Sequence, residues 1–183
     1  MLEYPNLEKI LELSTQPKIC NKALKYFIDN FDDKYSDGYN ADAINIAFLP
    51  CSEQDIYAKP SECFINSDCA VMGFNVIHQD YRFQAEKLGL HQHPNHKQLF
   101  ERLIEDAPLT ENKAKEIFEY LATRQDEFIE SEWNILSNTK FIPTRNKGQP
   151  DIIVYKSPRG CFFKGQEMYE FIILINKFSC LFF

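Results

Sequence analysis

One element occurs twice in this chain, within residues 47–66 and again, more loosely, within residues 140–164. Each copy begins with an aromatic-aliphatic-proline triplet, passes through a polar loop to a tyrosine, and then reaches a Lys/Pro/Ser cluster and Cys-Phe. The two strings are AFLPCSEQDIYAKPSECFIN and KFIPTRNKGQPDIIVYKSPRGCFFK. Because proline has no N–H to donate to a ladder, each triplet ends a short apolar run. The sequence therefore predicts two β-elements that echo each other, and no acid, base or metal ligand recurs with them.

Helical periodicity dominates the rest of the chain, so the expected fold class is α+β, mostly helical. Two helices are expected within residues 5–31, the first capped by Asn6 and the second following Pro17. Four more are expected: one capped by Asp80 and ending at Gly89, one following Asn95, and two capped by Thr110 and Ser131. Their expected core residues are Phe83, Leu88, Leu99, Phe100, Leu103, Ile104, Ala114, Ile117, Phe118, Leu121, Trp133 and Leu136.

Short strands and turns are expected between the helices. Strands are predicted over residues 43–49, 62–65, 71–77 and 152–155, a loop over 32–42 and a turn over 146–148. In the third strand, alternation would point Met72, Phe74 and Val76 at the core. The expected organisation has four segments. Residues 1–40 form an N-terminal helical segment, and residues 41–109 form a first β-plus-helix-pair unit. Residues 110–167 form a helical linker with the second β unit, and residues 168–183 form an apolar tail interpreted as a truncated or mis-spliced end.

The composition and net charge restrict which binding partners and which cellular compartment are expected for this protein. The net charge is −7 and no basic stripe is present, so neither nucleic acid nor an anionic membrane is an expected partner. The first thirty residues lack a signal-peptide pattern. The tail is too short, and too interrupted by Glu170 and Lys177, to predict a membrane span. We therefore expect a cytoplasmic protein in which the six cysteines are reduced and mainly pack the core.

The residue types that could carry chemistry do not form a recognisable pattern. His91, His93 and His96 lie close together in HQHPNH, but no Cys-x-x-Cys pair or H-E-x-x-H motif accompanies them. The chain has no G-x-S-x-G motif, and its six glycines form no phosphate-binding loop. We therefore predict no catalytic, cofactor-binding or metal-binding residues, no cofactor, and no enzyme activity.

A set of short strings, taken in order, gives a family resemblance. They are AFLPC, YAKPSECFIN, MGF, YRFQAEKLGLHQHPN, KAKEIFEYLATRQ, KFIPT and SPRGCFFKGQE. Together they resemble a domain of unknown function in large fungal proteins that carry an N-terminal ATPase of the GHKL superfamily, which includes heat-shock protein 90 and histidine kinases. The layout of those proteins is similar to that of sacsin. The resemblance covers about residues 40–167.

The resemblance implies a position in a larger protein rather than a reaction. This chain lacks the catalytic Glu, the metal-holding Asn and the D-x-G-x-G motif of the GHKL ATPases; Asp37-Gly38 is the nearest approach. The implied function is a non-catalytic segment downstream of the ATPase, for scaffolding or for contact with clients and partners. The implied partners are other proteins or the ATPase portion of the same polypeptide. The alternatives are an independent helical interaction module and a small metal-dependent enzyme that uses the HQHPNH stretch.

Overall fold

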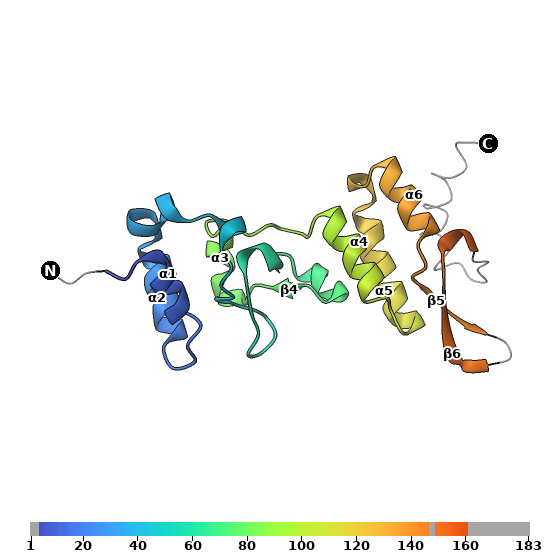
Figure 1. Cartoon of the computed structure of the whole chain (residues 1–183), viewed down its shortest axis with the longest axis horizontal. Helices are drawn as coiled ribbons and strands as arrows, with labels where there is room; N and C mark the ends of the chain where they lie inside the picture. The colour runs from blue at the N-terminus through green and yellow to red at the C-terminus, as the bar shows by residue number, and fades with distance from the viewer. Residues whose placement is uncertain (1–3, 147–148, 161–183) are drawn as a thin grey trace. The chain divides into compact units, whose positions relative to one another are not determined.

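The computed structural model describes residues 4–146 and 149–160 (Figure 1). The chain divides into two compact units, Met1–Pro94 and Asn95–Phe183. This division falls inside segment 41–109 of the expected organisation. Both units combine helices with two-stranded sheets, which confirms the α+β, mostly helical class. No helix in the described ranges is long and apolar enough to cross a membrane.

The first unit begins with a pair of packed helices, α1 (Leu7–Leu13) and α2 (Cys20–Asp29). The side chain of Asn6 accepts the N–H of Lys9 at 2.8 Å, so the predicted cap is confirmed. The apolar stripes of the two helices face each other, and Leu11 and Phe27 are fully buried. Both helices were predicted because their caps and stripes are local features of the sequence.

The strands of this unit are shorter than expected. β1 (Leu49–Pro50) pairs antiparallel with β2 (Tyr57–Ala58), and β3 (Cys63–Phe64) pairs in parallel with β4 (Asn75–Val76). The strand predicted over 43–49 is therefore wrong except at its end. The predicted strand over 71–77 is also mostly wrong, because a 3₁₀ helix (Ser67–Met72) runs into Gly73 at φ 74° before β4 begins. Neighbouring side chains of Val76 and Ile77 are both buried, so the expected alternation fails.

The helix expected after Asp80 is also reduced. A 3₁₀ turn (Gln79–Tyr81) leads into α3 (Arg82–Ala85), and the ring of His78, not the side chain of Asp80, accepts a backbone N–H at this end. Positions two residues apart lie on opposite sides of a helix, so with Ala85 buried the side chain of Phe83 is 96 % exposed, which corrects its assignment to the core. Leu88 is buried as expected.

The second unit contains three helices, α4 (His96–Glu105), α5 (Glu111–Thr123) and α6 (Glu130–Asn138). Asn95 and Gln98 form a capping box at the start of α4, and Thr110 caps α5. The cap predicted at Ser131 is wrong, because the N–H of Ile129 instead donates to the carboxylate of Glu132 at 2.9 Å. The predicted core residues that are confirmed as buried are Leu99, Leu103, Ala114, Ile117, Phe118, Leu121, Trp133 and Leu136.

Two predicted core residues of α4 differ in the structure. Ile104 is 53 % exposed, because α4 packs into the core through Leu99 and Leu103, which share one face of the helix. Phe100 is partly buried and stacks on Phe128 with ring centroids 5.4 Å apart.

The repeated sequence element forms the same local structure in both units. β5 (Ile142–Asn146) and β6 (Gln149–Lys156) make the second antiparallel pair. In the first pair Pro50 lies opposite Tyr57, and in the second Pro143 lies opposite Tyr155. A 3₁₀ turn follows each pair, Pro60–Glu62 in one unit and Pro158–Gly160 in the other, and both prolines are buried. The predicted echo is therefore confirmed as two hairpins of matching register.

Each hairpin is anchored to the helices of its own unit by two residues of the repeated element, a phenylalanine and a tyrosine. The ring of Phe48 meets Phe27 of α2 edge to face at 5.8 Å, and Phe141 meets Phe118 of α5 in the same way at 5.6 Å. The repeated tyrosines reach back to the region where those helices begin. The Tyr57 hydroxyl lies 3.4 Å from the Cys20 thiol, and the Tyr155 hydroxyl lies 3.4 Å from a backbone carbonyl before α5. The tip of the predicted turn at 147–148, residues Cys161 and Cys180 and the tail at 168–183 lie outside the described residues.

Candidate functional site

The acidic segment after α2, which the sequence predicts as a loop, is helical. Phe31–Tyr35 forms a π-helical turn, and Ser36–Gly38 continues as a 3₁₀ turn. The rings of Phe31 and Tyr35 both pack on Phe27, with centroids 5.5 Å and 5.3 Å away. Burial of these two rings fixes the turn. π-helical turns are rare and are frequently found at functional sites.

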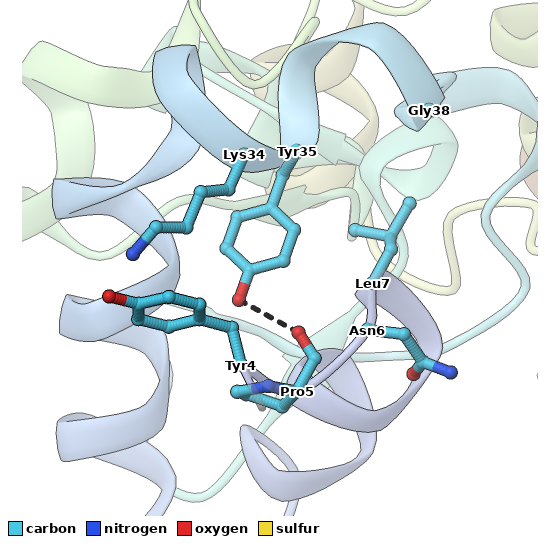
Figure 2. A pocket seen from close by; sticks show the side chains of 7 residues that line it. All are labelled: Tyr4, Pro5, Asn6, Leu7, Lys34, Tyr35 and Gly38. Carbon is cyan, nitrogen blue, oxygen red and sulfur yellow. Dashed lines mark hydrogen bonds between the residues drawn. The ribbon is translucent and has the colours of Figure 1, made fainter. Parts of the chain in front are cut away.

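A pocket of about 500 Å³ opens beside this turn, against the residues that precede and begin α1. It is lined by Tyr4, Pro5, Asn6, Leu7, Lys34, Tyr35 and Gly38 (Figure 2). The hydroxyl of Tyr35 donates to the carbonyl of Pro5 at 3.1 Å and so joins the turn to the start of α1. Burial, with a further contribution from Tyr26, raises the pKa of Tyr35, so the phenol stays protonated and remains a donor.

The charge in the pocket belongs to Lys34. Its ammonium group lies 3.5 Å from the centroid of the Tyr4 ring, a cation–π contact, and donates to Asn30 Oδ1 at 2.6 Å and to the Tyr26 hydroxyl at 3.3 Å. Within residues 4–146 and 149–160, no carboxylate forms an ion pair with it. The arrangement places a cation beside aromatic and aliphatic surface, which suits binding of a group that is partly anionic and partly apolar.

The structure does not assemble the three histidines of HQHPNH into a metal site. The side chain of His91 is exposed, and Nε2 of His93 lies 3.2 Å from the amide nitrogen of Asn66 in the first unit. His96 belongs to α4 of the second unit and contacts Glu132. In the part of the chain that the structure describes, no group of three His, Cys, Asp or Glu side chains could hold a metal ion.

His96 and Glu132 form a pair of ionisable side chains in the second unit. Nδ1 of His96 lies 2.9 Å from Oε2 of Glu132, which also accepts the N–H of Ile129. Burial opposes ionisation of Glu132, but the bonds from His96 and Ile129 and the charge of His96 lower its pKa. The ring of Phe128 packs edge to face on the imidazole at 5.7 Å. The pair joins α4 to α6, and these contacts include no serine, threonine or cysteine nucleophile.

The cysteines of the described ranges pack the first unit. Cys20, Cys51, Cys63 and Cys69 are free and buried. The hydrogen bond with Cys51 and the burial of the thiol raise the pKa of Cys63. A thiol in that environment is a poor nucleophile, because the thiolate is the reactive form.

The described residues form a helix-rich α+β chain with a pocket beside Lys34 and no group of three side chains that could hold a metal ion. The chain belongs to the family described as "Protein of unknown function (DUF3684)", whose model matches residues 1–179. A search of curated proteins and a search of solved structures each found no match. The resemblance to a domain of unknown function is thereby confirmed.

Proposed function

We propose that this chain is a non-catalytic segment of a large chaperone-like protein, positioned downstream of a GHKL-type ATPase domain, where it acts as a scaffold and contacts partners. The observation that carries the proposal is the Lys34 pocket. It combines an aromatic wall with a cation, and the described residues that line it include no histidine, cysteine, aspartate or glutamate that could act as base or nucleophile. Such a pocket supports recognition more than chemistry.

Exposed apolar side chains support a role in protein contact. Large apolar residues at the surface include Phe83, 96 % exposed, Leu109, 68 % exposed, and Ile129, 63 % exposed. Aromatic side chains are enriched among the residues that dominate binding energy in protein interfaces. The proposed partners are therefore proteins, including the ATPase portion of the same polypeptide.

The family resemblance is the basis for the proposed larger protein, which would resemble the large fungal proteins that are similar to sacsin in layout. The net charge of −7 supports a cytoplasmic location with protein partners over nucleic acid or an anionic membrane. The GHKL motifs that hold nucleotide do not occur in this sequence. ATP chemistry would then belong to another part of the native polypeptide.

Purified chain should neither bind nor hydrolyse ATP. Turnover would be measured by phosphate release with and without Mg²⁺, alongside isothermal titration with ATP. Magnesium-dependent turnover that co-purifies with the chain would refute the proposal. Elemental analysis of the same sample tests the alternative of a histidine-based metalloenzyme, which requires stoichiometric zinc or another transition metal.

A further inference from the structure

The two units begin alike in sequence and in local structure. The strings Tyr4-Pro5-Asn6 and His93-Pro94-Asn95 both place an aromatic ring and a proline before an asparagine. Each asparagine caps a helix by accepting the N–H three residues later, at 2.8 Å for Asn6 and 3.0 Å for Asn95. In both units a later helix carries the phenylalanine that anchors the hairpin, Phe27 or Phe118, eight residues after its N-cap position. The two units therefore share a helix cap at their start and a phenylalanine anchor for the hairpin.

In both units, a segment that follows the second helix returns to the start of the first helix. In the second unit this return is closed by the contact between Nδ1 of His96 and the carboxylate of Glu132. In the first unit the return is made by Tyr35, whose hydroxyl donates to the carbonyl of Pro5. Lys34 lies next to Tyr35 and receives no carboxylate from the described residues, and a pocket lies open beside it. Among the described residues of the first unit, this cation therefore has no acidic partner.

We propose that the Lys34 pocket binds a carboxylate side chain of a protein partner, with an adjacent apolar side chain of that partner against Tyr4, Leu7 and Tyr35. The inference rests on the proposed partner-binding function and names the chemistry of the partner. A carboxylate would complete the coordination of the ammonium group in place of water. The rings beside it would bury apolar surface of the ligand.

The other charges on the turn restrict the ligand further. Asp32 is paired with Lys87, with 2.6 Å between Oδ2 and Nζ, so it does not compete for Lys34. Asp33 and Asp37 are exposed on the same turn and would repel a long acidic run. The fitting ligand is therefore a single Glu or Asp next to an apolar residue rather than a polyacidic segment.

The test is an NMR titration of the full chain with two matched peptides, N-acetyl-Phe-Glu-amide and N-acetyl-Phe-Gln-amide. The acidic peptide should shift the amide signals of residues 4–7 and 34–38 and bind about 1.4- to fivefold more tightly than the neutral one, the range for an exposed charge pair. Equal affinity of the two peptides, or shifts elsewhere only, would overturn the proposal.

Three variants distinguish the contribution of the Lys34 charge to peptide binding from the contribution of the shape of the pocket. Lys34→Met should remove the preference for the acidic peptide. Gly38→Trp should abolish binding of both peptides, since a Cβ at Gly38 meets nothing within 4 Å and the ring can fill the pocket without backbone strain. Lys25→Met, at an exposed lysine of α2 paired with Asp29, should change neither affinity. If the Lys34→Met variant still binds the acidic peptide more tightly than the neutral one, the inference is refuted. The ATP measurement described above tests the proposed function independently of this result.

Discussion

Replacing the repeated phenylalanines tests whether the two hairpins are anchored in the same way. The side chains of Phe48 and Phe141 are each 0 % exposed, so truncation to alanine removes a fully buried ring and leaves a cavity. Such a change costs about 3–5 kcal/mol. About 0.5–1.5 kcal/mol of this is the edge-to-face contact with Phe27 or Phe118. Phe48→Ala and Phe141→Ala should therefore destabilise their own units by similar amounts.

The assay is urea unfolding followed by two probes. Fluorescence of Trp133, the single tryptophan of the chain, reports on the second unit, and hydrogen exchange of the peptide containing Phe27 reports on the first. Phe83→Ala is the matched control, because that ring is 96 % exposed and its loss should change the free energy of unfolding by less than about 0.5 kcal/mol. The reasoning fails if either buried variant is as stable as the wild type, or if Phe83→Ala is as costly as they are.

Three further variants probe local features of the structure. Gly89→Ala should lower the melting temperature, with a cost of about 1–3 kcal/mol, because Gly89 has φ +72° and an added Cβ would lie 2.7 Å from that of Ala41. Glu132→Gln should remove a pH dependence. Because the bonds from His96 and Ile129 lower the pKa of Glu132, its carboxylate stabilises the fold above the ordinary carboxyl pKa, and that stability is lost as the pH falls through the lowered value. Acid titration of the second unit should therefore flatten in the variant. Asn95→Ala should cost about 0.5–2 kcal/mol and speed hydrogen exchange at the start of α4, whereas Asn95→Asp should preserve the cap.

The sequence predicts those parts of the fold that are encoded within a few residues. Helix α5 was predicted with its cap at Thr110 and its buried stripe, because both follow from spacing along one helix. The hairpin echo was predicted because the Pro and Tyr positions recur in order. The exposure of Phe83 is not predicted, because the sequence does not show that Ala85, on the opposite side of α3, is the residue that packs into the core.

The candidate site could not be predicted in the same way. Tyr4 and Lys34 are distant in sequence and meet because the turn after α2 returns to the start of α1 through the bond between Tyr35 and Pro5. The sequence signal that was present, an aromatic ring and a proline before a helix cap, is short and common. Lys34 has hydrogen-bond partners but no carboxylate partner among the described residues, which becomes visible only when the contacts of the fold are known.

The size and content of the native polypeptide test the central claim most directly. An antibody raised against residues 4–94 would isolate the protein from its source, and mass spectrometry would identify every peptide in the same band on a denaturing gel. The proposed function predicts a polypeptide far larger than the 21.5 kDa of this chain, with peptides of a GHKL-type ATPase domain in the same band. A native species of 21.5 kDa that contains only this sequence would contradict the account.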